Sequence, residues 1–171
     1  MKKYSSVETA IGTVYAAATE RGICRIALNA TETEFQRKAP GAVRDDAALA
    51  RPLGLLRRYL AGENVSLDSI EVDVSAGTRL QQAVWRALRG IPKGTTVSYG
   101  QLAALVGRPR AARAIGNIVG HNPVAFILPC HRVVRADGSL GGFGLGADIK
   151  EYLLETIEKA SLLPHATARS R

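Results

Sequence analysis

The pattern of apolar residues changes at residues 75–77 (Ser-Ala-Gly), and this change constrains the fold more than any other feature of the sequence. Before it, apolar residues form short runs and alternations typical of β-strands, with one helical stretch, and after it they recur mainly at helical spacing. The 171 residues are enough for one ordinary domain, or for a small and a medium one. We therefore predict an α+β protein with domains over 1–75 and 76–160, and a mobile tail over 161–171.

The N-terminal domain is predicted to be a small α/β unit with a short antiparallel sheet. Two β-type runs in residues 9–30 flank Glu20-Arg21-Gly22, which is a hairpin signal. Residues 31–46 are polar and are interrupted by proline and glycine, which predicts a loop or a frayed helix. Leucines at helical spacing predict a helix over 46–61, and the alternation in SIEVDV (69–74) predicts a third strand.

The C-terminal domain is predicted to be mostly helical. Its first helix carries a stripe of Leu80, Val84 and Leu88 and places Trp85 in the core. Around the middle of the domain, residues 124–128 form an apolar run that predicts a short buried strand ending at Pro129. A last helix is predicted over 148–159.

Two short helices joined by a glycine turn lie between these elements. The first, in SYGQLAALVG (98–107), begins with a capping box of Ser98 and Gln101. Its buried face is expected to comprise Leu102, Leu105 and Val106. The apolar positions of the second, in AARAIGNIVG (111–120), are Ala111, Ala114, Ile115, Ile118 and Val119. Such a pair predicts a helix-turn-helix in a winged-helix-like domain.

Basic residues gather in the second half of the chain. The formal net charge is +8, and the stretch from Arg79 to Arg135 holds nine Lys or Arg residues and no Asp or Glu. A solvated basic surface would account for such a stretch, but its length without an acid favours a polyanionic partner. We predict that this partner is nucleic acid.

The sequence disfavours several kinds of site and location. Cys24 and Cys130 lie far apart, and the first residues, MKKYSSVETAIG, lack the apolar core of a signal peptide, so reduced thiols are expected. The three histidines have no zinc-ligand spacing with these cysteines. No apolar run approaches the roughly 18 residues of a membrane span. We expect a cytoplasmic protein that uses no metal and no other cofactor.

Cys130 stands in LPCHRVV (128–134), directly before a histidine. Thiolate is the nucleophilic form of cysteine; His131 could take the thiol proton, and the charges of Arg113 and Arg132 could favour the anion. Neighbouring side chains of an extended strand point to opposite faces, so direct contact between Cys130 and His131 is not guaranteed, and a water bridge could connect them. On these residues alone, a reactive thiol and an inert buried one are equally supported.

The longer stretch NPVAFILPCHRVV (122–134) resembles the active-site signature of the O6-alkylguanine-DNA alkyltransferases, also called methylated-DNA–protein-cysteine methyltransferases. The resemblance continues through residues 81–116 and 141–154, and residues 11–28 look like the family's less specific N-terminal domain. It implies a DNA repair protein that moves one alkyl group irreversibly to cysteine from the O6 of guanine, with O4-alkylthymine as a second candidate substrate. The implied partner is double-stranded DNA, and we expect a monomer in solution.

The resemblance also implies roles for residues near the thiol. Cys130 would accept the alkyl group, His131 would deprotonate it through a water, and Asn122 would tie the recognition helix to the cysteine loop. Tyr99 would donate a proton to the purine, and the carbonyl of Val133 would bind the guanine amino group.

Other implied roles concern DNA and the substrate pocket. Arg113 would fill the space left by the flipped base. Its helix would lie in the minor groove through Ala112, Gly116 and Val119. Phe143 stands where the family usually has tyrosine, and Gly144 would offer a backbone N–H to the purine oxygen.

The last helix departs from the family pattern. The family places the glutamate that orients the histidine three residues after a Leu-Leu pair, but the residue at that spacing from Leu153-Leu154 is Ile157. Glu158 lies one residue further, about 100° around an α-helix, and Glu155 lies two residues earlier. Glu158 is the predicted partner of His131 only if the helix changes register.

Two other functions remain open at this point. One is a helix-turn-helix regulator in which Cys130 is a structural residue. The other is a Cys-His hydrolase, which would need an oxyanion hole and would turn over repeatedly.

Overall fold

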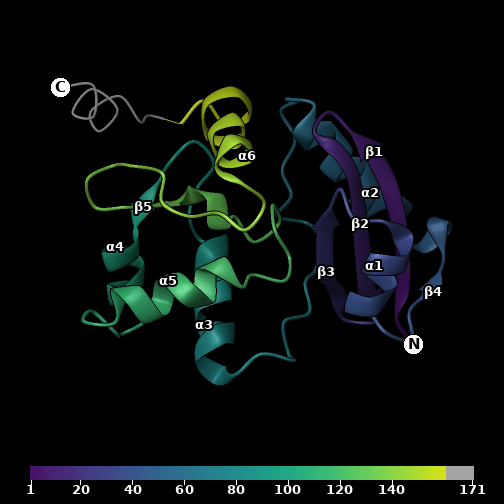
Figure 1. The fold of residues 1–171 in the computed structure, drawn as a ribbon, viewed down its shortest axis with the longest axis horizontal. Helices are drawn as coiled ribbons and strands as arrows, with labels where there is room; N and C mark the ends of the chain where they lie inside the picture. The colour runs from purple at the N-terminus through teal and green to yellow at the C-terminus, as the bar shows by residue number, and fades with distance from the viewer. Residues whose placement is uncertain (161–171) are drawn as a thin grey trace. The chain divides into compact units, whose positions relative to one another are not determined.

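The computed structural model describes residues 1–160 and divides them into two compact units (Figure 1). The first, here called the sheet unit, comprises Met1–Ala76 together with Pro123–Ile127. The second, here called the helical unit, comprises Gly77–Asn122 and the described residues from Leu128 onward. The sequence did not predict that residues 123–127 group with the N-terminal part. The tail predicted over 161–171 lies outside the described residues.

The sheet unit is built on a four-stranded sheet in the order β3-β2-β1-β4. Its strands are β1 (Lys3–Thr9), β2 (Gly12–Thr19), β3 (Gly22–Leu28) and β4 (Val43–Arg44). The predicted hairpin between β2 and β3 is confirmed, whereas β1 and β4 were not predicted. The sheet is not wholly antiparallel, because β4 pairs parallel to β1.

Two helices cover the two faces of this sheet, α1 (Glu32–Lys38) in front and α2 (Asp46–Leu60) behind in Figure 1. Thr31 and Glu34 form a capping box at the start of α1 (Glu32–Lys38), so the stretch expected to be a loop or a frayed helix contains a short, well-capped helix. The predicted helix over 46–61 is confirmed as α2 (Asp46–Leu60), which buries its leucines.

The prediction of a third strand over 69–74 is wrong. Only Val72 pairs with the sheet, in a single parallel bridge to Ile23 of β3. Further along the same edge, the N–H of Ile26 donates to the carbonyl of Pro123 at 2.8 Å. Two short segments, around Val72 and Pro123, therefore pair with the edge of β3, and neither forms a full strand.

The strand predicted over 124–128 is also wrong, although its burial is right. These residues form turns in which every side chain is at most 7 % exposed. Phe126 has a φ of 70°, in the left-handed region that an extended strand excludes. The apolar run therefore reflects burial on all sides rather than strand geometry.

The helical unit contains short helices and one small parallel sheet. In chain order its elements are α3 (Arg79–Arg89), β5 (Val97–Ser98), α4 (Tyr99–Leu105), α5 (Ala112–Gly120), the 3-10 helix η1 (Cys130–Arg132), β6 (Val133–Val134), α6 (Ala147–Glu151) and the π-helix η2 (Tyr152–Ile157). Trp85 of α3 is buried as predicted, and its indole N–H donates to the carbonyl of Ile118 at 2.9 Å. The predicted capping box of Ser98 and Gln101 begins α4.

Two apolar side chains of α4 and α5 are more exposed than predicted, and a third, Val119, is buried on the predicted apolar face but cannot contact DNA as predicted. Leu105 is 68 % exposed, because the buried stripe of α4 runs through Leu102 and Ala103 and Leu105 lies off it. Ala114 is exposed for the same reason, since α5 turns Ile115 and Val119 inward. Val119 is only 4 % exposed, so this side chain offers no surface to DNA.

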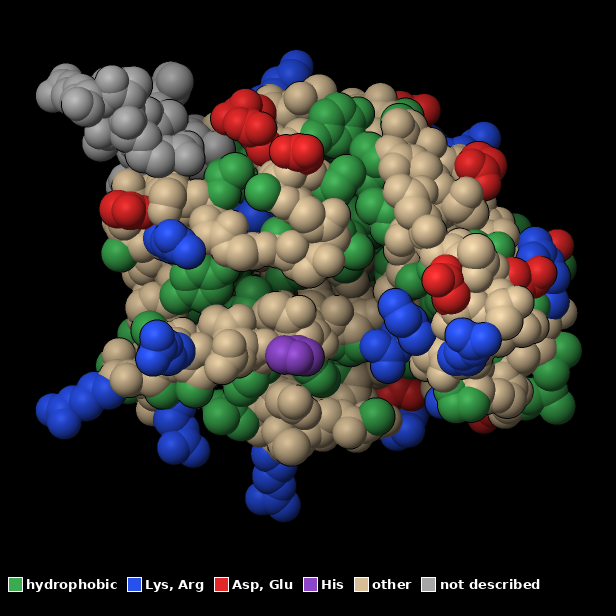
Figure 2. Space-filling model, in the orientation of Figure 1, with side chains coloured by type: hydrophobic (Ala, Val, Ile, Leu, Met, Phe, Trp, Pro, Cys, Tyr) green, Lys and Arg blue, Asp and Glu red, His purple; other side chains and the backbone are tan. Residues whose placement is uncertain are grey.

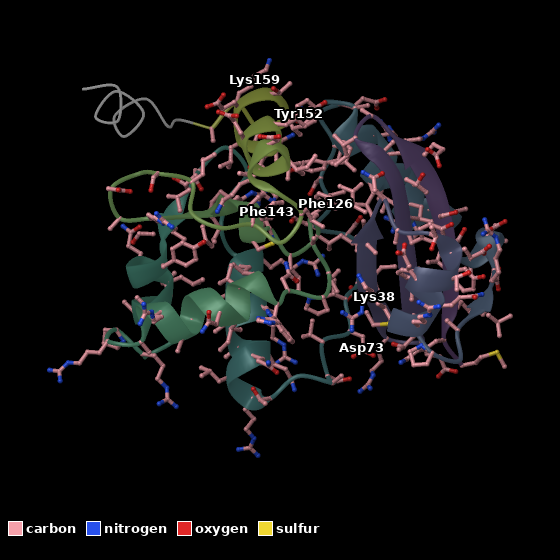
Figure 3. All side chains as sticks on the ribbon, viewed as in Figure 1. Lys38, Asp73, Phe126, Phe143, Tyr152 and Lys159 are labelled. Atoms are coloured by element: carbon pink, nitrogen blue, oxygen red, sulfur yellow. The ribbon has the colours of Figure 1, made fainter. Side chains whose placement is uncertain are left out.

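The last predicted helix consists of two kinds of turn. It begins as α6 and continues as the π-helical η2. In Figure 3, the label Tyr152 marks the start of η2 and the label Lys159 lies just beyond its end. None of the helices in residues 1–160 combines the length and the apolarity that a membrane crossing needs.

Candidate active site

Cys130 opens a tight 3-10 turn rather than the end of a strand. Its N–H donates to the carbonyl of Leu128 at 2.8 Å, and the N–H of Arg132 donates to the carbonyl of Pro129 at 3.0 Å. Cys130 is 7 % exposed and His131 is fully buried. The turn replaces the extended geometry assumed from the sequence, in which Cys130 and His131 would point to opposite faces.

Asn122 ties the end of α5 to this turn. Its Nδ2 donates to the carbonyl of Leu128 at 2.7 Å. Burial raises the pKa of the Cys130 thiol, and a hydrogen bond from the same Asn122 side chain partly offsets this rise. One amide therefore fixes the backbone before the cysteine and favours its anionic form.

Glu158 is the carboxylate that holds His131. Oε2 of Glu158 lies 2.6 Å from Nε2 of His131, and neither side chain is exposed. A carboxylate accepts a hydrogen bond here, so neutral His131 carries its proton on Nε2. Nδ1 is then the nitrogen that can accept a proton from a thiol.

The π-helix brings Glu158 into this position. The N–H of Glu158 donates to the carbonyl of Leu153, five residues earlier, at 2.8 Å. A π turn holds one residue more than an α turn, so it absorbs the residue that separates Glu158 from the spacing expected of the family. Glu155 is exposed on the same segment.

Arg132 holds the same carboxylate from another side. Its Nε and Nη2 donate to the Glu158 carboxylate at 2.8 to 3.1 Å, and its Nη1 donates to the carbonyl of Ile91 at 2.6 Å. The N–H of Gly94 adds a bond to Oε1 of Glu158 at 3.2 Å. The sequence suggested only a nearby charge for Arg132, whereas the structure shows it positioning the acid.

The thiol and the imidazole are both neutral at rest. Burial raises the pKa of Cys130, against the opposing effects of Asn122 and Lys150. Burial also lowers the pKa of His131, against the opposing effects of its hydrogen bond and charge interaction with Glu158. A thiolate therefore forms when the thiol proton moves to the imidazole.

Lys150 is a buried residue that the sequence reading missed. It is fully buried, and its Nζ donates to the carbonyls of Val133 at 2.6 Å and Gly142 at 3.3 Å. Burial lowers its pKa to about 8. A lysine in GADIKEYLL gives no sequence signal of burial, because lysine is almost always exposed in a helix of this kind.

The predicted pocket residues lie around this ammonium. Nζ of Lys150 is 5.9 Å from the ring centre of Tyr99 and 6.0 Å from that of Phe143, which Figure 3 labels. Tyr99 is half-buried, and burial raises its pKa. Gly141, with a φ of 73°, passes so close that a Cβ there would lie 3.1 Å from the Tyr99 hydroxyl oxygen. Gly144 is exposed.

The proposed DNA-binding residues divide between surface and core. Arg113 is exposed on α5, while Ala112 and Gly116 are half-buried and a Cβ on Gly116 would contact the Tyr99 ring at 3.4 Å. Figure 2 shows several Lys and Arg side chains projecting from the helical unit. The exposed members of the basic stretch are Arg79, Arg86, Lys93, Arg108, Arg110, Arg113 and Arg135. No cluster of three or more Cys, His, Asp or Glu side chains suited to a metal occurs within residues 1–160.

Two family models match the chain. Residues 2–74 match the ribonuclease-like domain of 6-O-methylguanine DNA methyltransferase, and residues 79–159 match its DNA binding domain. Among curated relatives, the methylated-DNA–protein-cysteine methyltransferase of Mycolicibacterium paratuberculosis is 39 % identical over 90 % of this chain and 91 % of its own length. The protein of the same name from Methanosarcina acetivorans is 38 % identical over 89 % of this chain and 96 % of its own.

Solved structures give the same result. Mycobacterium tuberculosis OGT in complex with DNA superimposes with a TM-score of 0.80 and 36 % identity, covering 96 % of this chain and 99 % of that one. The matches span both units and include the stretch with Cys130 and His131. The chain belongs to the family of methylated-DNA–protein-cysteine methyltransferases.

Proposed function

We propose that the protein repairs DNA by transferring the alkyl group of O6-alkylguanine to Cys130 in a single irreversible step. The observation that carries this proposal is the arrangement of half-buried Asn122 with buried Cys130, His131 and Glu158, in which each residue has a defined partner or neighbour. The comparisons with known family members support the same reaction.

The proposed step balances without any further reactant. The thiol proton moves to Nδ1 of His131, through a water, and Glu158 stabilises the resulting imidazolium. The thiolate sulfur attacks the alkyl carbon, the bond from that carbon to O6 breaks, and its electron pair passes to the purine. Tyr99 donates a proton to the purine as it leaves, and the proton held by His131 then passes through water to the Tyr99 phenolate, so both residues return to their resting states. The product is a thioether, which is a poor electrophile, so each molecule acts once.

The substrate base must leave the duplex to reach a thiol that is 7 % exposed. We assign Arg113 to the space that the base vacates, because it is the exposed arginine of α5. Ala112 and Gly116 support this arrangement because their small size lets α5 approach the DNA closely. The carbonyl of Val133, Phe143 and the backbone of Gly144 complete the proposed purine pocket.

The test is to incubate the protein with a duplex containing O6-methylguanine and to weigh its peptides. The peptide with Cys130 should gain the mass of one CH2 group, and the peptide with Cys24 should not. Cys130→Ser should abolish transfer while keeping duplex affinity, and Cys24→Ser should transfer normally. Methylation of Cys24, or transfer by Cys130→Ser at a normal rate, would refute the proposal.

The same experiment separates the two other functions. A helix-turn-helix regulator would bind duplex DNA and leave Cys130 unmodified. A Cys-His hydrolase would release product in molar excess over protein. We further propose that the protein acts as a monomer in the cytoplasm; a sedimentation profile of the free protein tests its oligomeric state.

A further inference from the structure

We propose that Arg132 weakens His131 as a base in the resting protein, so that Cys130 stays a thiol and reacts slowly with electrophiles other than the substrate. This proposal rests on the proposed function, in which each molecule reacts once. A thiol that is not regenerated is lost to repair when any other electrophile alkylates it. The substrate is oriented at the sulfur by its pocket, whereas a small electrophile in solution is not, so a weak base penalises chiefly the unwanted reaction.

Arg132 takes most of the hydrogen-bonding capacity of the Glu158 carboxylate. Its Nε donates to both carboxylate oxygens, at 2.9 and 3.1 Å, and its Nη2 donates to Oε2 at 2.8 Å. His131 reaches only Oε2, at 2.6 Å from its Nε2, and shares that oxygen with the guanidinium. A guanidinium is always charged and its fork matches a carboxylate. The charge of Glu158 is therefore balanced before His131 gains any proton.

The loop between α3 and β5 fixes both members of this ion pair. The Nη1 of Arg132 donates to the carbonyl of Ile91 at 2.6 Å, and the N–H of Gly94 donates to Oε1 of Glu158 at 3.2 Å. The side chain of Arg132 is 11 % exposed and that of Glu158 is not exposed. Charges so far out of water interact strongly, so the guanidinium has a large influence on whatever else binds this carboxylate.

The charged groups that face His131 come from three elements. Burial lowers the pKa of His131 most, Glu158 just after η2 raises it, and Arg132 of η1 and Lys150 of α6 lower it. Arg132 therefore opposes the imidazolium in two ways, since it repels that charge and also occupies the carboxylate that would stabilise it.

The nucleophile responds to other groups. Burial raises the pKa of Cys130, and the side chains of Asn122 and Lys150 partly offset this rise. The guanidinium of Arg132 donates instead to Glu158 and to a backbone carbonyl. Its charge is thus directed at the acid and the base, and it acts on the sulfur through them. Arg132 is therefore a positioning residue.

The expected sign follows from the proton balance between thiol and imidazole. The thiolate forms as the thiol proton passes to His131, so a stronger base raises the thiolate population. Removing the charge of Arg132 leaves Glu158 to His131 alone, which should raise the pKa of His131 and make Cys130 more reactive. If Arg132 only held Glu158 in place, its removal would weaken the base and make Cys130 less reactive.

Two variants separate the charge of Arg132 from its shape. Arg132→Gln removes the charge and keeps amide donors for the carboxylate. Arg132→Lys keeps the charge and loses the planar fork. Arg57→Gln is the matched control, because Arg57 is exposed on α2 and the change removes the same charge.

The first readout is the rate at which iodoacetamide alkylates Cys130 at about pH 7.5 without DNA. The sulfur displaces iodide, and mass spectrometry follows the Cys130 peptide. Arg132→Gln should react about tenfold faster than the wild type, the change that corresponds to a base stronger by about one pKa unit. Arg132→Lys and Arg57→Gln should stay close to the wild type. An unchanged or slower Arg132→Gln, or an equally fast Arg132→Lys, would overturn the proposal.

The second readout is a nuclear magnetic resonance titration of the imidazole nitrogens. The chain has three histidines, so the signal of His131 is identified by its absence in His131→Asn. The pKa of His131 should be higher in Arg132→Gln than in the wild type. A lower pKa, as would result if Glu158 itself took up a proton, would overturn the proposal.

The same titration of the wild type does not require any Arg132 variant to fold. At about pH 7, His131 should be neutral and should carry its proton on Nε2. An imidazolium in the resting wild type would contradict the proposal. If the wild type transfers no methyl group from O6-methylguanine DNA, the proposed function fails, while the iodoacetamide and resonance measurements still test Arg132.

Discussion

The two units use the same kinds of charged side chain in opposite ways. In the sheet unit, the ion pairs lie outside: Lys3–Asp45, Arg44–Glu32, Arg44–Asp46 and Arg58–Glu63 have partners that are 32 to 66 % exposed. In the helical unit, the side chains of His131 and Glu158 are paired with no exposure, and Lys150 is as fully buried. Exposed pairs contribute little to stability, whereas buried charges interact strongly and change pKa values.

Asp73 shows that the sheet unit can also bury a charge. It is 8 % exposed, and its carboxylate accepts from the hydroxyls of Thr19 and Ser75 and lies 3.5 Å from Nε of Arg21. These partners lower its pKa to about 2. The carboxylate of Asp73 therefore stays ionised over the physiological pH range. In the helical unit, by contrast, Cys130 and His131 exchange a proton in the proposed reaction, and the pKa of Lys150 is lowered toward that range.

The largest expected effect follows from removing the acid that holds His131. Glu158→Gln should slow methyl transfer by about 100-fold or more, because the imidazole loses the charge that stabilises its protonated form. In the wild type Glu158 raises the pKa of His131, so its loss lowers that pKa and weakens the base. Glu155→Gln, an exposed neighbour, is the control in single-turnover assays. A normal rate for Glu158→Gln would show that His131 needs no carboxylate.

A smaller effect should appear in the pH dependence of unfolding. Lys150 has a pKa of about 8 when folded against an ordinary value of 10.5, so between these pH values the unfolded chain holds more protons. The free energy of unfolding should therefore rise with pH over this window. At about 1.4 kcal/mol per unit, the wild type should gain at most roughly 3 kcal/mol relative to Lys150→Met.

Urea unfolding of the wild type and Lys150→Met at about pH 7 and pH 10 measures that difference. Using the difference cancels the titration of groups common to both proteins. A constant difference across the window would mean that Lys150 is not held at a lowered pKa.

Arg113→Ala tests an exposed charge of the helical unit. If Arg113 fills the place of the flipped base, its loss should slow duplex repair by about thirtyfold, which corresponds to about 2 kcal/mol of lost compensation. Reaction with free O6-benzylguanine needs no flipping and should be nearly unchanged. Arg110→Ala, another exposed arginine near α5, is the control. Equal losses on both substrates would instead assign Arg113 to the pocket or the fold.

The smallest effect is expected for an ion pair of the sheet unit. Arg58 and Glu63 are 2.6 Å apart, with each side chain 50 % exposed. Arg58→Ala should change the free energy of unfolding by less than about 1 kcal/mol and should leave transfer unaffected. A loss of several kcal/mol in urea unfolding would remove the contrast between the two units.

Much of the fold and of the candidate site could be predicted from the sequence, and the predictions that were wrong have physical causes. The capping box of Ser98 and Gln101 and the Cys130-His131 motif depend on local spacing, so they were predicted, whereas the capped helix α1 was not. The strands over 69–74 and 124–128 were not there, because alternation or apolarity records burial and cannot show whether a partner strand is available. Lys150 was missed because a single lysine in a short helix says nothing about what covers it.

Glu158 illustrates the limit most clearly. Its spacing from Leu153-Leu154 matched no α-helical register, yet the structure places it on His131 through the π turn. The choice between α and π geometry is made by tertiary contacts, with Glu158 held by His131, Arg132 and Gly94 together. The sequence offered the right residue but not the geometry that makes it right.

The π turn of η2 has a consequence for how this part of the chain can vary. A helix that widens by one residue takes up an insertion locally, without sliding Leu153 and Leu154 out of the core or Glu158 away from its partners. The π turn thus lies between two fixed points, the buried leucines and the carboxylate of Glu158. We expect a one-residue difference in length to be accommodated there as long as the leucines stay buried and the glutamate keeps its partners, so the equivalent acid in another chain is to be identified by its contacts and not by counting residues.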